Sequence, residues 1–217
     1  MPHEVARFEY RVFALDLGIV EHRMRALGGV PKNHESAEFY LASSPNVTHN
    51  VKIRDGRLDI KVLVQAVRGL EQWEPRFTIA FPMDDAALAR LLETSLQVTE
   101  ALPMGAGASV ERLVNTLRQG RHGVVVAELF KRRSHFQVDD CIAEIVALTI
   151  NGAAIRTACV ESTEAEQVRT VVQQLGLDAF PNTSYLAAVR HLTGLAPSPD
   201  FARCARIAPD NEPGQHE

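Results

Sequence analysis

Short segments in which charged and apolar residues alternate recur along this chain. The clearest is Arg7-Phe8-Glu9-Tyr10-Arg11, where the odd positions are charged and the even positions are aromatic. Because successive side chains on a strand point to opposite faces of a sheet, this pattern predicts strands with one apolar and one charged face. A chain built from such strands has to fold into a sheet that buries at least one of its two faces.

The alternating and branched segments predict about eight strands, mostly in meander order. The pairs Asp55-Gly56 and Asn151-Gly152 separate strand segments and are typical of two-residue β-hairpin turns. A meander of this length can close on itself, which removes exposed sheet edges. Strands are expected at residues 5–15, 36–42, 48–54, 57–65, 75–82, 123–138, 141–150 and 153–162, and helices at 16–27, 84–101, 110–119, 164–175 and 184–193.

Length and composition favour one globular domain over residues 1–195, followed by an irregular or disordered tail at 196–217. Of the 217 residues, 46% are hydrophobic, which is enough for a core, and the net charge of −4 does not suggest nucleic-acid binding. We expect no membrane span, because no run of 18 apolar residues occurs. The cysteines Cys141, Cys159 and Cys204 form no CxxC pair, so we expect reduced thiols in a cytoplasmic protein.

Basic residues gather on the charged faces although the chain as a whole is acidic. Lys52 shares a strand face with Arg54, and Lys131 shares one with Arg133, while Lys61 lies opposite an apolar face. If helices cover a closed sheet from outside, these faces point into its lumen, where only an anion or opposing charges can compensate them. Arginine suits phosphate, because its planar fork binds phosphate oxygens in pairs. The alternative is that the charged faces lie in water, as on a half-buried antiparallel sheet.

Three carboxylates, those of Glu9, Glu144 and Glu161, lie on three separate predicted strands. Carboxylates commonly hold the Mg²⁺ or Mn²⁺ that bridges to phosphate oxygens. The alternative for each glutamate is a pairing with a neighbouring arginine. No histidine pair has metal-ligand spacing, although His135 continues the face of Lys131 and Arg133, and Trp73 is expected to be a packing residue in a loop or at an edge.

Several stretches carry a resemblance to a known family, in the same order along most of residues 5–195. They are the N-terminal alternation, VKIRDGRLDIK (51–61), FKRR (130–133), VEST (160–163) and LGLDAFPNTSYLAAV (175–189). Together they resemble the CYTH group, the triphosphate tunnel metalloenzymes, and most of all an adenylate-cyclase-like bacterial branch. The resemblance implies an α+β fold, with an eight-stranded antiparallel β tunnel (barrel) and flanking helices, that binds triphosphate-containing ligands.

The resemblance also implies site residues, matched position by position. The family signature ExExK falls on Arg7, Glu9 and Arg11, so that only Glu9 keeps its type, Arg11 keeps the charge of the lysine and Arg7 reverses the first glutamate. Val146 and Cys159 stand where further acids would be expected. The implied roles are Glu9 and Arg11 in catalysis; Arg7, Lys52, Arg54, Lys61, Lys131 and Arg133 in substrate binding; and Glu9, Glu144 and Glu161 in holding Mg²⁺ or Mn²⁺.

Three functions are consistent with these residues. The first is a metal-dependent phosphohydrolase acting on inorganic triphosphate or a related organic triphosphate. The second is a non-catalytic module that binds polyphosphate or a nucleotide, and the third is cyclisation of ATP. In each, the partner is a triphosphate-containing small molecule or polyphosphate rather than nucleic acid or a membrane, and a homodimer is left open.

Overall fold

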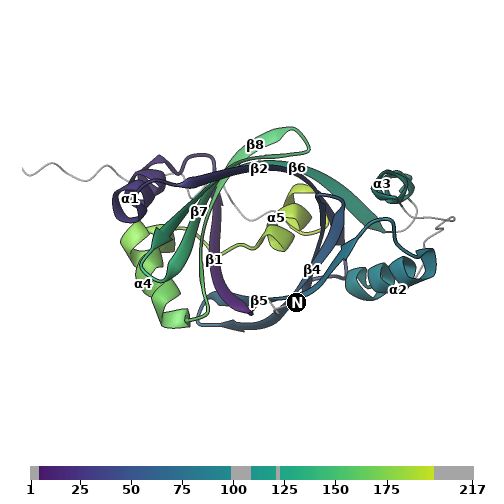
Figure 1. Cartoon of the computed structure of the whole chain (residues 1–217), viewed down its shortest axis with the longest axis horizontal. Helices are drawn as coiled ribbons and strands as arrows, with labels where there is room; N and C mark the ends of the chain where they lie inside the picture. Colours follow the sequence, from purple (N-terminus) through teal and green to yellow (C-terminus); the bar gives the residue numbers. More distant parts are fainter. Residues whose placement is uncertain (1–4, 99–108, 121–122, 198–217) are drawn as a thin grey trace, which may run out of the picture.

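Eight antiparallel strands form a closed barrel in a computed structural model that describes residues 5–98, 109–120 and 123–197 (Figure 1). Around the barrel the strands follow the order β1-β5-β4-β3-β2-β6-β7-β8. The predicted fold class and the number of strands are confirmed. The strands are β1 (Arg7–Ala14), β2 (Lys32–Ser43), β3 (His49–Arg54), β4 (Arg57–Val67), β5 (Leu70–Ala80), β6 (Val124–Val138), β7 (Cys141–Ile150) and β8 (Ala153–Ser162).

Tight turns with left-handed backbone connect neighbouring strands. Both predicted turns are present, and in Asp55-Gly56 the φ angles are +50° and +67°, a conformation that asparagine, aspartate and glycine tolerate best. A third turn, Arg68-Gly69, was not predicted. It extends β4 to Val67 and starts β5 at Leu70, so Trp73 lies within a strand that pairs with β1 and β4 on its two sides. The expectation of a loop or edge position for Trp73 is therefore wrong.

Five helices occur where the sequence predicts them, with ends shifted by a few residues. The largest difference is in α2, which ends at Leu96 because Gln97 adopts a left-handed conformation. Residues 99–101 of that predicted helix lie outside the described residues. The helices are α1 (Gly18–Gly28), α2 (Asp85–Leu96), α3 (Val110–Arg118), α4 (Ala165–Leu175) and α5 (Tyr185–Leu192), with one 3₁₀ turn at Leu177–Ala179.

Four helices cover the outside of the barrel and bury its apolar face. Figure 1 shows α1 and α4 on one side of the ring of strands, and α2 and α3 on the opposite side. Met24 and Val172 belong to the first outer core, while Leu92 and Leu113 belong to the second. Because the apolar faces point outward to these helices, the charged faces point into the lumen. This is the arrangement that a covered, closed sheet predicts.

The fifth helix fills one end of the lumen (Figure 1). Tyr185 and Val189 of α5 pack against lumen-facing residues such as Phe13 and Leu148, in a third apolar core. The segment before α5 is fixed to β1, because the Thr183 amide donates to the Arg11 carbonyl at 2.7 Å and the Arg11 amide donates to Asn182 Oδ1 at 2.8 Å. The lumen therefore has an apolar end that α5 fills and a charged half at the other end.

Some expectations concern parts of the chain that the structure does not describe. Cys204 and residues 198–217 of the predicted tail lie outside the described residues, and the domain boundary near residue 195 stays a prediction. Cys141 and Cys159 are both buried free thiols. None of the helices in the described ranges combines the length and the apolar character that crossing a membrane requires.

Truncating Leu92 to alanine should destabilise the fold strongly. Leu92 is fully buried between α2 and the barrel, and loss of such a side chain costs about 2–5 kcal/mol. Leu27→Ala on α1 is the matched control, because 53% of Leu27 is exposed and the change should stay within about 0.5 kcal/mol. Urea unfolding measures both, and equal midpoints for the two variants would contradict the packing of α2 on the barrel.

Candidate anion-binding cavity

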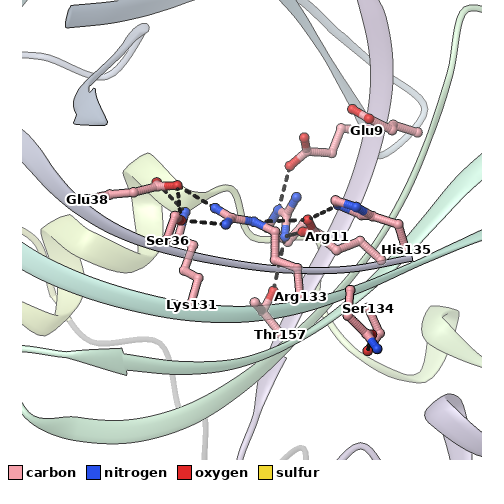
Figure 2. A network of polar contacts seen from close by, with 12 residues as sticks. Glu9, Arg11, Ser36, Glu38, Lys131, Arg133, Ser134, His135 and Thr157 are labelled. Carbon is pink, nitrogen blue, oxygen red and sulfur yellow. Dashed lines mark hydrogen bonds and ion pairs between the residues drawn. The ribbon is translucent and has the colours of Figure 1, made fainter. Parts of the chain in front are cut away.

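The charged half of the lumen encloses a cavity of about 210 Å³. Because lumen-facing side chains come from every second residue of each strand, the cavity collects side chains from all eight strands and from the start of α5. Figure 2 shows part of its floor, where side chains of β1, β2, β6 and β8 converge. The lining residues are Glu9, Arg11, His34, Tyr40, Asn50, Lys52, Arg54, Lys61, Trp73, Lys131, Arg133, His135, Glu144, Glu161, Ser184 and Tyr185.

Nearly all of the predicted site residues lie around this cavity. The exception is Arg7, which lies at the rim, where its Nη1 donates to Glu161 Oε1 at 3.2 Å and 45% of its side chain is exposed. The structure thus brings together residues separated by more than 150 positions in the sequence. Their roles in binding or catalysis stay predictions.

Glu38 of β2 is the central counter-ion of the floor (Figure 2). Its side chain is fully buried, and it accepts hydrogen bonds from Lys131 Nζ at 2.8 Å, from Ser36 Oγ at 2.9 Å and from Arg133 Nη2. Burial alone raises the pKa of this carboxyl, but the charges of Lys131, Lys52 and Arg133 outweigh burial and hold the pKa well below its ordinary value. Glu38 is therefore ionised and tied to β6.

Glu144 of β7 is a second counter-ion, closer to the rim. Its Oε1 accepts from Arg11 Nη1 at 3.1 Å, while its Oε2 lies 3.3 Å from Arg133 Nε and 2.8 Å from His135 Nε2. Burial raises the pKa of Glu144, but the hydrogen bond with His135 and the charges of Arg11 and Arg133 more than offset it, so that the pKa is lowered well below the ordinary range. Both of its oxygens are engaged.

The cations on this side of the cavity are largely saturated by protein acceptors. Arg133 uses Nη1 for Ser36 Oγ at 2.6 Å, Nη2 for Glu38 and Nε for Glu144. Lys131 is 1% exposed, and it bonds to Glu38 and to the Tyr40 hydroxyl at 2.9 Å, with the Tyr185 ring centroid 3.7 Å away. These two side chains shape the local field but have little hydrogen-bonding capacity left for a ligand.

The opposite wall, formed by β3 and β4, carries cations with few partners. Arg54 lies 3.4 Å from Asp59, 3.8 Å from Asp55 and 3.9 Å from Glu38, and 35% of its side chain is exposed, so that the two lysines are the cations with few partners. Within the described part of the chain, no hydrogen bond or ion pair joins Lys52 or Lys61 to another side chain. Burial lowers the pKa of Lys52 to about 8, although the charge of Glu38 opposes that shift. This wall offers ammonium and guanidinium groups to whatever occupies the cavity.

The three carboxylates expected to hold Mg²⁺ or Mn²⁺ do not fit a divalent ion in this arrangement. Each is bonded to an arginine: Glu9 Oε1 to Arg11 Nε at 2.8 Å, Glu144 to Arg11 and Arg133, and Glu161 to Arg7. Across the described residues, no three His, Cys, Asp or Glu side chains gather closely enough to share one ion. The geometry instead matches the other expectation from the sequence, in which each of these glutamates pairs with an arginine.

Sequence reasoning missed several residues of the cavity. Ser36, Glu38 and Tyr40 alternate on one face of β2 like the charged residues that were predicted, so the same pattern could have found them. Tyr185 had no such signal, because only the packing of α5 into the lumen places it beside Lys131. Val146, where the resemblance would have an acid, instead lies in the apolar core under α5.

Comparisons with known proteins give likenesses of structure only. No family model matches the chain, and no curated protein matches it. A conserved hypothetical protein of Pyrococcus furiosus is 15% identical, with a TM-score of 0.48 over 83% of this chain and 98% of that one. The structural neighbours also include putative adenylate cyclases, as the sequence resemblance suggested.

Two of these neighbours illustrate the level of similarity. A putative adenylyl cyclase of Hippeastrum, described as having a dominant triphosphatase activity, is 13% identical, with a TM-score of 0.48 over 87% of this chain and 96% of that one. A putative adenylate cyclase of Bacillus halodurans is 12% identical, with a TM-score of 0.46 over 83% and 96% of the two chains. Likenesses at this level transfer no residue role to this chain.

The buried carboxylates should make the fold sensitive to acid. The pKa values of Glu38 and Glu144 are lowered on folding, so their stabilisation is complete above the ordinary glutamate pKa of about 4.3 and is lost as the pH falls below it. Urea unfolding between pH 7 and pH 3, in steps of about half a unit, measures how steeply the free energy of unfolding falls with pH. Glu144→Gln should flatten this slope, because an amide does not titrate.

Glu128→Gln is the control for that measurement. Glu128 is 55% exposed and pairs with Arg118 at the surface, where solvent screens the interaction. The slope of this variant should match that of the unaltered chain. If Glu144→Gln also left the slope unchanged, Glu144 would not be the buried, ionised group that the geometry describes.

Proposed function

We propose that this chain is a triphosphate tunnel protein whose cavity binds the end of a linear polyphosphate anion, with inorganic triphosphate as the simplest example. One observation carries the proposal: six cationic side chains line the cavity against three carboxylates, and two of the cations have no partner among the described side chains. With the buried charge of Glu38 and with Asp59, which lies 3.4 Å from Arg54, included, six cations face five carboxylates, so that positive charge still exceeds negative charge. A multiply charged anion compensates such an excess, which is otherwise costly in a partly buried site.

The free donors indicate which residues would contact the ligand. Lys52 and Lys61 form no hydrogen bond or ion pair with a described side chain, so we assign them to the phosphoryl oxygens, together with the partly exposed Arg54 beside them. Arg11 adds its Nη2 nitrogen, because its bonds to described side chains use only Nε and Nη1. Lys131 and Arg133, by contrast, would act through their field. Charge-assisted bonds from several directions suit phosphoryl groups, each of which offers more than one oxygen.

The shape of the lumen indicates how the anion would lie. Because α5 fills the far end with apolar side chains, the ligand would enter past the rim formed by Arg7, Lys61 and Glu161. A terminal phosphoryl group would then lie innermost, and whatever follows it would point toward solvent. This orientation accepts inorganic triphosphate and the end of a longer polyphosphate.

Binding is the function that the geometry supports best, and hydrolysis is a separate question. A metal-dependent phosphohydrolase needs carboxylates that can hold an ion, and those of this cavity are bonded to arginines. ATP cyclisation needs a pocket for adenine in addition. An assay of phosphate release from triphosphate, with Mg²⁺ or Mn²⁺ and with Glu9→Gln as control, tests hydrolysis: release that Glu9→Gln abolishes would establish an enzyme.

Binding itself is tested by isothermal titration calorimetry with sodium triphosphate, using Lys52→Met. Loss of one charge-assisted contact costs about 1.5–3 kcal/mol, so the affinity should fall by roughly 10- to 100-fold. Lys32→Met is the matched control, since Lys32 is exposed on β2 and does not line the cavity. A chain that binds no triphosphate, or a Lys32→Met variant as weak as Lys52→Met, would contradict the proposed site.

The affinity for triphosphate should fall as the pH rises above about 8. The pKa of Lys52 is lowered to about 8 by burial, so its ammonium is charged below that pH and loses its proton above it. A bound anion favours the charged form, and binding near pH 8.5, about half a unit above that pKa, should therefore take up protons. Lys52→Arg should lose the part of this pH dependence that comes from residue 52 and keep only that of the triphosphate's own last proton, because arginine stays charged. Equal pH profiles for the two proteins would exclude Lys52 as the titrating contact.

A further inference from the structure

Arg11 occupies an unusual position for a cation in this cavity, because it lies between two carboxylates and against an aromatic ring. Its Nε donates to Glu9 Oε1 at 2.8 Å and its Nη1 donates to Glu144 Oε1 at 3.1 Å. The guanidinium carbon lies 4.4 Å from the centroid of the Tyr185 ring, and only 7% of the side chain is exposed. Figure 2 shows Arg11 in the middle of the network, with Glu9 above it.

A divalent ion that bridges Glu9 Oε1 and Glu144 Oε1 would have to displace this guanidinium, which bonds both oxygens. Arginine cannot release its proton to become a neutral neighbour, and a displaced guanidinium would remain buried without its counter-ions. Breaking a buried ion pair in this way is strongly unfavourable, because it leaves an uncompensated charge in the interior. The second oxygen of Glu144 is held by Arg133 and His135, so this carboxylate has no unengaged oxygen for an incoming ion.

The backbone around Arg11 keeps it in place. The amide and carbonyl groups of Arg11 are bonded to Asn182 and Thr183, in the segment that leads into α5. Tyr185, the first residue of α5, supplies the ring that stacks on the guanidinium. The position of this cation is therefore fixed from both sides, by the carboxylates of the strands and by the segment that fills the lumen.

We propose that Arg11 is a built-in cation that takes the place of a divalent ion between Glu9 and Glu144, so that the cavity captures its anion without metal. The carboxylates position the guanidinium, and the Nη2 nitrogen of Arg11 remains to bind a phosphoryl oxygen. The statement that the cavity captures an anion without metal depends on the proposed function. The statement that Arg11 takes the place of an ion between Glu9 and Glu144 does not.

Replacing Arg11 tests this directly, because it should convert the carboxylate pair into a metal site. In Arg11→Met, Glu9 and Glu144 lose the cation that separates them, and Mn²⁺ should bind there. Electron paramagnetic resonance of free Mn²⁺ measures the uptake. We expect about one Mn²⁺ per chain for Arg11→Met, no such site in the unaltered chain, and loss of the new site in the Arg11→Met/Glu144→Gln double variant. Arg11→Lys, which keeps the charge, should not gain the site.

Stability provides a second readout that does not depend on Mn²⁺ counting. Mn²⁺ should raise the melting temperature of Arg11→Met and leave that of the unaltered chain unchanged, because a ligand stabilises only the state that binds it. An Arg11→Met chain that unfolds in EDTA and folds when Mn²⁺ is added would also support the proposal. A variant that stays unfolded in both conditions, or that folds without taking up Mn²⁺, would overturn it. So would uptake of Mn²⁺ by the unaltered chain that Glu144→Gln abolishes.

Triphosphate titrations in EDTA and in Mn²⁺ separate this proposal from the proposed function. We expect the unaltered chain to bind triphosphate in EDTA. Binding only in the presence of Mn²⁺ would overturn the role of Arg11 while keeping the anion site. No binding in either condition would remove triphosphate as the ligand, and the Mn²⁺ results for Arg11→Met would still decide whether Arg11 takes the place of an ion.

Discussion

The ion pairs of Glu38 with Lys131 and Arg133 are the interaction on which the interior of this barrel depends. A closed sheet covered by helices turns its charged face inward, where no bulk water compensates it. Glu38 compensates two of these inward-facing charges, since its completely buried carboxylate on β2 pairs with two cations of β6. Removing one member of such a group would leave another charge buried and uncompensated, which is far more costly than losing a surface pair.

The same requirement explains why the two walls of the cavity differ. On the side of β1, β6 and β7, every arginine that faces the lumen is matched by a carboxylate, and the wall is close to neutral. On the side of β3 and β4, Lys52 and Lys61 form no ion pair with any described residue, and Arg54 lies 3.4–3.9 Å from three carboxylates. On one wall the cations are paired with carboxylates, and on the other the unpaired positive charge of the lysines is available to an anion.

The alternation of residue types was sufficient to predict the strands and their charged faces, because a period of two residues specifies which side chains share a face, while the closed tunnel was implied by the family resemblance. It located eight strands, the hairpin turns with Gly56 and Gly152, and most of the residues that line the cavity. It could not locate Tyr185 or the apolar end of the lumen, because these depend on where α5 packs after the barrel has closed. Nor could it decide whether Glu9 and Glu144 face a metal or Arg11, since that choice depends on side-chain positions across strands that are distant in sequence.

The packing of α5 in the lumen also determines where a ligand can enter and leave the cavity. With Tyr185 and Val189 filling one end, the described part of the lumen is a pocket rather than an open passage. A linear anion bound as proposed would therefore have its terminal group held inside and could not pass along the axis beyond α5. Such an anion would enter and leave at the charged end, where the ion pair between Arg7 and Glu161 lies beside Lys61.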